Sequence, residues 1–280
     1  MRFTKMHGLG NDFIVIDDRG KALSDLSRLS ETLCDRRTGI GGDGVILVQN
    51  SASAITQMRI FNSDGSEAEM CGNGIRCFAK YVYDSKIVQA EVFSVETLAG
   101  IMEISLSAEN GIAKTVTVNM GKPVLEREKI PVTGTGTCLN QTLAVSDREF
   151  TCSTILLGVP HTVVFTDHVN EADVLSYGPA IETLPLFPKK TNVNFTQVLD
   201  SENIRVRTWE RGCGMTLACG TGASSAAVCC ALSGLTGRRV NAHLALGTLL
   251  IDWAEDGAVY MTGPAASVYE GEIDLSLFQK

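Results

Sequence analysis

A four-residue element built around a cysteine occurs twice in this chain, and each copy leads directly into a segment with helical periodicity. The copies are Cys-Gly-Asn-Gly at 71–74 and Cys-Gly-Thr-Gly at 219–222, so about half of the 280-residue chain separates them. Two copies are too few to build a solenoid of stacked repeats. One copy in each half instead predicts two similar domains that face each other across a cleft.

Segments of strand type outnumber those of helical type along the sequence. Alternating strand patterns recur, for example at 13–16, 45–48, 115–118 and 204–207, and helical periodicity is clear at about 22–37, 72–84, 171–183 and 221–233. We therefore expect an α+β chain. The glycines and prolines that follow residue 118 indicate a boundary, with one domain over 1–118, completed by about 263–280, and a second over 119–262.

The charge and its distribution indicate what kind of partner the chain binds. The formal net charge is −8, and the lysines and arginines are scattered rather than clustered. This pattern argues against nucleic acid and against an anionic membrane as partners, and it favours a small-molecule substrate. The uncharged segment 212–237 is rich in glycine and serine, so we expect a buried helix there rather than a membrane span.

The cysteines point to a reducing compartment. Nine of them occur at irregular spacing, and the N-terminus lacks the continuous apolar core of a secretory signal, so a cytoplasmic location is expected. No pair has the C-x-x-C spacing of a zinc site, and the four histidines form no metal-ligand pattern on one helix. We expect no metal site, and most of the thiols are expected to be small core residues.

A cysteine before a glycine-rich turn that opens a helix has two chemical uses. Its thiol lies near the positive end of the helix, where a thiol pKa is expected to fall from about 8.5 toward neutrality. The backbone N–H groups that follow form an anion site suited to a carboxylate. If Cys71 and Cys219 reach opposite sides of one α-carbon, one thiolate can remove a proton and the other thiol can deliver one to the opposite face. Such an inversion needs no cofactor in principle.

Each copy of the element has simpler explanations when it is taken alone. A buried cysteine beside glycine is common packing, and a glycine-rich turn before a helix can bind phosphate. Neither copy has the lysine of a G-x-x-x-x-G-K-[ST] loop or the spacing of a dinucleotide-binding motif, which disfavours a nucleotide ligand. The duplication therefore favours the catalytic interpretation.

Further motifs make the sequence resemble the diaminopimelate epimerase family, nearly from end to end. They are Lys-Met-His-Gly-Leu-Gly-Asn-Asp-Phe at 5–13, Phe-Asn-Ser-Asp-Gly-Ser at 61–66, Cys-Gly-Asn-Gly-Ile-Arg-Cys at 71–77, Glu-Arg-Gly at 210–212, Ala-Cys-Gly-Thr-Gly-Ala at 218–223 and Met-Thr-Gly-Pro at 261–264. The resemblance implies two pseudo-symmetric domains, each a strand-rich barrel-like sheet around a central helix, with the active site in the cleft between them. It also implies interconversion of LL- and meso-diaminopimelate without pyridoxal phosphate or metal, in the supply of lysine and peptidoglycan precursors.

The same resemblance assigns roles to individual residues. The catalytic thiols are those of Cys71 and Cys219. The residues that would hold the reacting carboxylate are Gly72, Asn73, Gly220 and Thr221, and those that would recognise the distal amino-acid centre are Asn11, Asn62, Asn192, Glu210 and Arg211. The residues that would adjust the pKa values of the thiols are His161 and Glu210, and Tyr269 would contact the partner subunit of a homodimer.

Two positions depart from the family pattern. Val159 stands where many members have asparagine, and Gly44 stands where some have glutamine, so the substrate is less tightly implied than the reaction type. The nearest alternative is a two-thiol racemase of another amino acid, whereas an isomerase of the phenazine-biosynthesis type normally lacks the two thiols. A non-catalytic protein that captures a carboxylate is the alternative from a different class, and it would exchange no α-proton.

Overall fold

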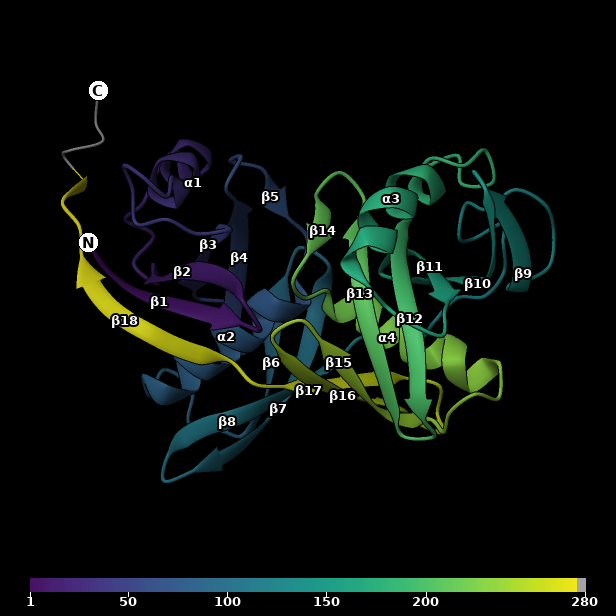
Figure 1. Cartoon of the computed structure of the whole chain (residues 1–280). Helices are drawn as coiled ribbons and strands as arrows, with labels where there is room; N and C mark the ends of the chain where they lie inside the picture. The colour runs from purple at the N-terminus through teal and green to yellow at the C-terminus, as the bar shows by residue number, and fades with distance from the viewer. Residues whose placement is uncertain (276–280) are drawn as a thin grey trace. The chain divides into compact units, whose positions relative to one another are not determined.

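The computed structural model describes residues 1–275, and the backbone forms two compact units (Figure 1). Unit 1 comprises Met1–Val118 together with the C-terminal segment from Gly263, and unit 2 comprises Asn119–Thr262. The described residues contain four α-helices and a larger number of strands. The prediction of an α+β chain with strands in the majority is confirmed.

The strands of unit 1 follow one path of paired neighbours. Along this path they are β18 (Ala266–Glu272), β1 (Arg2–Gly8), β2 (Asn11–Asp17), β3 (Gly44–Gln49), β4 (Thr56–Asn62), β6 (Val92–Thr97), β7 (Gly100–Glu109) and β8 (Ile112–Asn119), with the short β5 (Glu67–Ala68) also paired to β4. The pairs β2–β3 and β4–β6 are parallel. Parallel neighbours need a crossover connection, and helices α1 (Leu26–Cys34) and α2 (Gly72–Asp84) lie in these two connections.

Unit 2 follows the same path with different residues. Its strands, in the equivalent order, are β9 (Cys138–Val145), β10 (Arg148–Leu157), β11 (Val159–Phe165), β12 (Asn192–Asp200), β13 (Asn203–Glu210), β15 (Arg239–Leu244), β16 (Gly247–Trp253) and β17 (Val259–Gly263), with the short β14 (Gly214–Thr216) paired to β13. The pairs β11–β12 and β13–β15 are parallel, and their connections contain α3 (Glu171–Glu182) and α4 (Gly220–Leu232).

The two units therefore repeat one topology, strand for strand and helix for helix. The register repeats as well. Strands β3 and β4 pair Ile46 with Ile60, and the equivalent strands of unit 2 pair Asn194 with Thr208. The prediction of two pseudo-symmetric domains is confirmed, and the repeat allows residues of the two units to be matched position by position.

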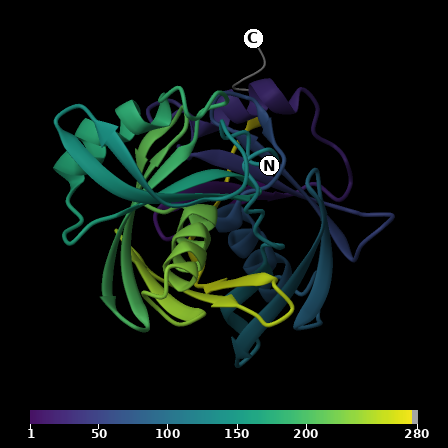
Figure 2. The same cartoon turned by 90° about the vertical axis from the view of Figure 1, so that its right-hand side faces the viewer.

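Each unit packs one helix against the inner faces of its strands. Helix α2 contacts β1, β2, β3, β4 and β7, and α4 contacts β10, β11, β12, β13, β15 and β16. Figure 2 shows α4 running between the strands of unit 2. A helix that is enclosed on most sides has no polar face, which explains why α4 consists of small uncharged residues. The buried helix expected within the uncharged segment is confirmed.

The outer helices cover the other face of the strands. In unit 1, Leu33 of α1 belongs to an apolar cluster with Ile14 and Leu47. In unit 2, Val174 of α3 belongs to a cluster with Phe195. Alternate residues of one strand thus face the outer and the central helix. None of the helices among the described residues is long and apolar enough to span a bilayer.

Helix α1 is shorter than the predicted segment 22–37, because carboxylates bind the backbone on both sides of it. Asp18 Oδ1 accepts a hydrogen bond from the backbone N–H of Ala22 at 2.9 Å, which holds the preceding residues in a turn. Asp35 Oδ1 accepts one from the backbone N–H of Arg37 at 2.8 Å. Such local hydrogen bonds compete with those of a helix and end it.

Candidate active site

Cys71 is the N-cap residue of α2, and its sulfur accepts a hydrogen bond from the backbone N–H of Gly74 at 3.4 Å. The two residues between them, Gly72 and Asn73, open the helix and are buried. Backbone N–H groups in the first turn of a helix lack partners within the helix, so this end can bind an anion. The first copy of the repeated element has the local structure that the sequence predicts.

Asn11, at the start of β2, is joined to this helix end. Its Oδ1 accepts hydrogen bonds from the Cys71 thiol at 3.7 Å and from Asn73 Nδ2 at 3.3 Å. Its Nδ2 donates to Asp43 Oδ2 at 2.7 Å. Because a carboxylate only accepts, Asp43 fixes the amide of Asn11 with its oxygen toward the thiol.

A chain of ion pairs supports Asp43. Arg36 donates to Asp43 Oδ1 at 2.8 Å and to Asp12 Oδ1 at 2.7 Å, and Asp12 lies 2.6 Å from the buried ammonium group of Lys5. Burial raises the pKa of Asp12, but hydrogen bonds from Arg36 and Lys5 outweigh burial and hold that pKa well below its usual range. Arg36 thus holds Asp43 through Oδ1, the oxygen that does not contact Asn11.

Arg76 of α2 is fully buried and orients the start of its own helix. Its guanidinium donates to the backbone oxygen of Gly72 and to Asn73 Oδ1, each at 2.9 Å, and its Nε donates to the backbone oxygen of Pro264 at 3.2 Å. Because a guanidinium group only donates, Arg76 faces the oxygen of the Asn73 amide, and the Nδ2 of Asn73 is directed toward Asn11.

Cys219 is the N-cap residue of α4, in the second copy of the element. Its thiol interacts electrostatically with the carboxylate of Glu210 and lies 3.5 Å from the hydroxyl of Thr221. Glu210 Oε1 accepts a hydrogen bond from the hydroxyl of Thr216 at 2.5 Å. The two thiols thus have different partners, a neutral amide for Cys71 and a carboxylate for Cys219.

The pKa of the Cys219 thiol is shifted in the direction opposite to the sequence-based expectation. Burial raises this pKa well above its ordinary value and the Glu210 carboxylate raises it further, while Thr221 and the backbone N–H of Gly222 lower it. The expectation of a lowered pKa is wrong for this thiol, because the loss of solvation outweighs the favourable helix end. Burial also raises the pKa of Glu210, which makes its carboxylate more basic than an exposed one.

Asn192 and Arg211 are joined through the backbone. Asn192 Oδ1, at the start of β12, accepts a hydrogen bond from the backbone N–H of Arg211 at 2.7 Å. The exposed guanidinium of Arg211 donates to the backbone oxygen of Lys189 at 2.9 Å through one nitrogen. Its other N–H groups can therefore bind a carboxylate of a ligand.

His161 is fully buried on β11, opposite Asn192 of the parallel neighbour β12. Its Nδ1 lies 3.2 Å from Asn194 Nδ2. Burial, followed by the positive charge of Arg211, lowers the pKa of His161 to about 3. The ring is therefore neutral at physiological pH.

Two predicted residues lie outside these networks. Asn62, at the end of β4, donates from Nδ2 to the hydroxyl of Ser66 at 3.0 Å. Tyr269 of β18 is 47% exposed, and its ring packs edge-on against Phe3 with 6.0 Å between centroids. The structure of one chain therefore leaves Tyr269 available for a partner.

The two departures from the family pattern have structural counterparts. Val159 lies two residues before His161 and occupies in unit 2 the strand position that Asn11 occupies in unit 1. Its apolar side chain therefore cannot supply to Cys219 the amide that Asn11 supplies to Cys71. A Cβ added at Gly44 would lie 2.6 Å from the backbone oxygen of Phe61, and a longer side chain there needs a backbone shift.

Comparison with known proteins decides the family. The family model described as diaminopimelate epimerase matches residues 3–126 and 153–268. A diaminopimelate epimerase of Caldanaerobacter subterraneus subsp. tengcongensis is 50% identical over 276 residues, which cover 98% of this chain and 100% of that protein. One of Moorella thermoacetica is 51% identical over 278 residues, with the same coverage. The chain belongs to the diaminopimelate epimerase family.

Solved structures of other activities share the fold of this diaminopimelate epimerase family member. A hydroxyproline epimerase from Agrobacterium vitis, with bound trans-4-OH-L-proline, has a TM-score of 0.69 at 17% identity and covers 98% of this chain and 90% of its own. A phenazine biosynthesis protein of the PhzF family from Enterococcus faecalis has a TM-score of 0.70 at 14% identity, with 98% and 99% covered. At these identities the likeness establishes the fold.

Sequence reasoning missed several residues that surround the candidate site of this epimerase, among them Asp43, Asn194 and Thr216. Asp43 lies in a Gly-Gly-Asp-Gly segment, and an acidic residue among glycines next to a strand is a signal that could have indicated it. Asn194 lies two residues after Asn192, so the two share one face of a strand. No local signal marks Thr216, because its contact with Glu210 depends on the pairing of β13 and β14.

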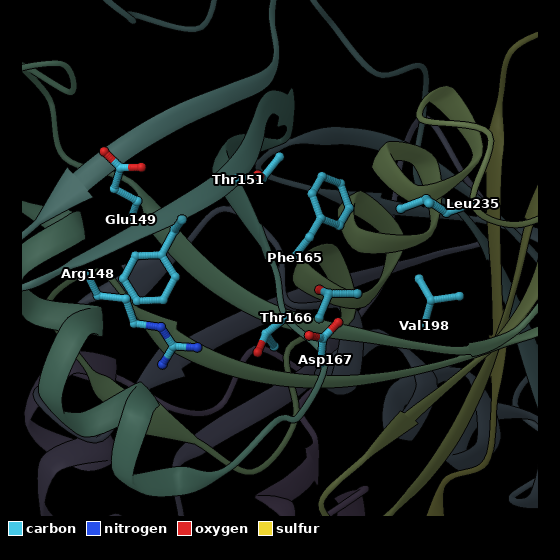
Figure 3. Close-up of a pocket in the computed structure, with 10 residues that line it drawn as sticks. Arg148, Glu149, Thr151, Phe165, Thr166, Asp167, Val198 and Leu235 are labelled. Atoms are coloured by element: carbon cyan, nitrogen blue, oxygen red, sulfur yellow. The ribbon is translucent and has the colours of Figure 1, made fainter.

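A separate cavity of about 510 Å³ lies in unit 2 (Figure 3). It is lined by residues of β10, β11 and β12, among them Arg148 and Phe165, by Asp167 in the segment after β11, and by Leu235 beyond α4. None of the residues expected in an epimerase site lines it. Within residues 1–275, no group of three or more histidine, cysteine, aspartate or glutamate side chains is arranged to hold a metal ion.

Proposed function

We propose that this chain interconverts LL- and meso-diaminopimelate by a two-base reaction in which Cys71 and Cys219 are the acid and the base. The observation that carries the proposal is the duplication of one local structure, since in each unit a cysteine caps a buried helix that opens with Gly-x-Gly. The substrate follows from the family, because relatives 50% and 51% identical over 98% of the chain are diaminopimelate epimerases.

Glu210 supports Cys219 as the thiol that gives up its proton first. The Cys219 thiol interacts electrostatically with this carboxylate, whose raised pKa makes it a suitable proton acceptor. Transfer of the proton from Cys219 Sγ to Glu210 leaves a thiolate, which removes the α-proton of the substrate. Because Glu210 is engaged with Cys219, we assign it to the thiol rather than to the distal ammonium group.

Asn11 supports Cys71 as the thiol that holds its proton at rest. Its amide oxygen accepts the S–H hydrogen bond, so the proton remains on Cys71 until it is delivered to the opposite face of the α-carbon. After the inversion Cys219 carries the α-proton and Cys71 is the thiolate, which is the state from which the reverse reaction starts. The reaction requires both thiols to reach the same carbon.

The helix ends and Arg211 would hold the substrate. Negative charge grows on the reacting carboxylate as the α-proton leaves, and the first-turn N–H groups of both helices can stabilise it. The residues proposed for that carboxylate are Gly72, Asn73, Gly220 and Thr221. For the distal centre we propose Arg211 with Asn192, Asn11 and Asn62, because the guanidinium retains donors for a carboxylate.

The wider context of the reaction is part of the same proposal. The two thiols supply the proton transfers and the helix ends supply the electrostatic stabilisation, so the reaction uses neither pyridoxal phosphate nor a metal. We place the reaction in the cytoplasm, in the supply of lysine and peptidoglycan precursors. We also propose that the functional domains are 1–118, completed by about 263–280, and 119–262, and that the enzyme is a homodimer with Tyr269 in its interface.

A panel of amino acids tests the substrate. The purified protein is incubated with LL-diaminopimelate and, separately, with L-proline, trans-4-OH-L-proline and L-histidine, and the configuration of each product is read by chiral chromatography. We expect turnover of diaminopimelate alone. Racemisation of a monocarboxylic amino acid without turnover of diaminopimelate would replace the substrate, with Val159 marking the altered pocket. Unchanged configuration of all four amino acids would favour a non-catalytic binding protein.

Single thiol replacements test the mechanism. Cys71→Ala and Cys219→Ala should each reduce kcat by at least about 10²- to 10⁴-fold, the usual contribution of a positioned acid or base. Matched controls are Cys77→Ala on α2 and Cys230→Ala on α4, whose buried thiols have a pKa raised to about 12 and so remain protonated. If either catalytic variant kept more than a few per cent of the wild-type activity, the two-thiol mechanism would be wrong.

A further inference from the structure

We propose that Asn194 and Thr208 are positioning residues that keep the proton of the neutral His161 ring on Nε2, from which it is donated to an anion in the active site. The observation is an asymmetry within one buried side chain. His161 Nδ1 has a hydrogen-bond partner, whereas its buried Nε2 has none among the described residues. This inference deepens the proposed function and rests on it, because the anion is either a substrate carboxylate or a catalytic thiolate.

The orientation of the Asn194 amide follows from its other contacts. Its Nδ2 lies 3.4 Å from the backbone oxygen of Thr162, which can only accept a hydrogen bond. Its Oδ1 accepts a hydrogen bond from the hydroxyl of Thr208 at 3.0 Å. Turning the amide over would place two oxygens against each other. The NH₂ group therefore faces Thr162 and His161.

The tautomer of His161 follows from that orientation. Asn194 Nδ2 donates to Nδ1 of the ring, so Nδ1 carries no proton, and in a neutral imidazole the proton is then on Nε2. A buried N–H without a partner is costly to leave unsatisfied. A ligand that accepts from Nε2–H offsets that cost, and an anion is the strongest such acceptor.

Unit 1 shows that the fold itself does not need polar residues at these positions. The registers of the equivalent strands match His161, Asn194 and Thr208 with Phe13, Ile46 and Ile60. All six side chains are buried, with exposures of 0–3%. The same backbone thus holds an apolar trio in one unit and a hydrogen-bonded trio in the other. Burial of polar groups is costly, so a functional role accounts for the polar trio better than packing does.

The surroundings of His161 leave few groups that can affect its protonation. The charged group that acts on it is Arg211. Its partners on the adjoining strands, Ile155 of β10 and Asn192 of β12, are uncharged, and α4 contains no charged residue. The titratable groups of α4 and its N-cap are Cys219, Cys229 and Cys230, and burial raises the pKa of all three.

Nuclear magnetic resonance on the ¹⁵N-labelled wild type tests the hydrogen bond directly. The chain has four histidines, so His161 can be assigned by comparison with a His161→Gln variant. We expect a protonated Nε2, an unprotonated Nδ1 and a through-hydrogen-bond coupling between Nδ1 and Asn194 Nδ2. A proton on Nδ1 would overturn the proposal, and this result needs no assay of activity, so it is independent of the proposed function.

The variant Asn194→Asp tests whether activity follows the tautomer. A carboxylate beside Nδ1 holds the proton there, as in the triads of hydrolases. With Nε2 unprotonated, kcat/KM should fall about 10- to 100-fold, the loss expected for a hydrogen bond to a charged group. The new carboxylate also raises the pKa of His161, so the ratio of variant to wild-type activity should rise as the pH falls and Nε2 regains its proton. If kcat/KM of Asn194→Asp did not follow the fraction of His161 rings with a proton on Nε2, the proposal would be overturned.

Whether KM or kcat changes in Asn194→Asp identifies the anion that accepts the hydrogen bond from His161 Nε2. A rise in KM assigns the acceptor to a substrate carboxylate, and a fall in kcat at unchanged KM assigns it to a thiolate. The matched control is Asn203→Asp, which places the same change beside His243, a histidine hydrogen-bonded to Asn203 and outside the site. This control should retain wild-type kinetics and show no such pH-dependent ratio.

A triple variant separates function from packing. His161→Phe, Asn194→Ile and Thr208→Ile together install the trio that unit 1 already contains. Replacing all hydrogen-bonded partners by apolar residues is often neutral or stabilising. We expect a melting temperature equal to or above that of the wild type together with a loss of activity of at least about 10-fold. A folded triple variant with wild-type activity would show that the polar trio has no role in the reaction.

Discussion

The orientation of a single amide, that of Asn11, determines what the Cys71 thiol faces. Asp43 Oδ2 holds the Nδ2 of this amide at 2.7 Å, which leaves the oxygen toward the sulfur. With Asp43→Asn the new amide can also donate, so Asn11 is free to turn over. We expect kcat/KM to fall about tenfold, the value of one lost hydrogen bond at its upper limit. If Asp17→Asn, a change at an exposed carboxylate of the same unit, lowered kcat/KM equally, the positioning role of Asp43 would be refuted.

Gly222 allows the start of α4 to approach Asn194. A Cβ at this position would lie 2.3 Å from Asn194 Oδ1 and 3.2 Å from the Cys219 sulfur. Gly222→Ala should therefore lower the free energy of unfolding by about 1–3 kcal/mol, as overpacking does, and reduce kcat by displacing both side chains. Urea unfolding and steady-state kinetics measure the two effects. Gly237→Ala is the control, because its nearest neighbour is 3.8 Å away, and equal effects of the two variants would contradict the account.

At the scale of elements, the strands β1 and β2 are tied to each other by an ion pair between the buried Lys5 and the partly buried Asp12. The pKa of Asp12 is below its unfolded value, so the stability from this carboxylate is complete above about pH 4 and is lost as the pH falls further. Asp12→Asn should cost on the order of 3 kcal/mol at pH 7 and less at pH 3. Urea unfolding at both pH values measures this, and an equal cost at both would exclude the ion pair as the cause.

The two central helices are the elements that the sequence predicts best. Helix α2 begins and ends within the predicted 72–84, because its capping cysteine and first glycines are adjacent in the chain and set the boundary locally. Helix α1 was predicted too long, since the hydrogen bond from Ala22 to Asp18 is not visible in an apolar periodicity. Local sequence signals therefore predict whether a segment is a helix or a strand more reliably than they predict the residues at which it begins and ends.

Without the family resemblance, the candidate site was predictable only where its residues belong to the repeated element. Cys71 and Cys219 follow from the duplication, but the partners that distinguish them do not. Glu210 reaches Cys219 because β13 continues into β14, and Asn194 reaches His161 because β11 and β12 are parallel neighbours. Those contacts depend on which strands pair, and strand pairing is a property of the whole unit.

At the scale of the molecule, the equivalence of the two units extends to the register but not to the chemistry. Unit 1 places an amide beside its thiol, and unit 2 places a carboxylate beside the other. Two similar groups in different environments can hold one proton between them, because their pKa values are moved apart. In the proposed mechanism, one fold that occurs twice, with different polar residues in each copy, supplies an acid and a base.

A substitution at Tyr269 tests whether the protein is a homodimer. This side chain is 47% exposed on β18, and a tyrosine at the family's dimer position is expected to be buried by a partner. Sedimentation equilibrium should give twice the chain mass of 30.0 kDa for the wild type and the chain mass for Tyr269→Glu. Leu246→Glu, at a leucine that is 57% exposed in unit 2, should remain dimeric. A wild-type protein that sediments as a monomer would exclude the proposed homodimer.

The central claim is that two different thiols exchange protons with opposite faces of one α-carbon. LL-diaminopimelate is incubated with the wild type in deuterated water, and the deuterium content of both product and recovered substrate is measured during the first few per cent of conversion. The donor thiol has exchanged with solvent, whereas the thiol that removes the α-proton returns that same proton when the reaction reverses. The account predicts one deuterium at the inverted α-carbon of the meso product and none in the recovered substrate. Deuterium in both the product and the recovered substrate at the earliest times would show that one group exchanges protons with both faces of the α-carbon, and it would contradict the two-thiol mechanism.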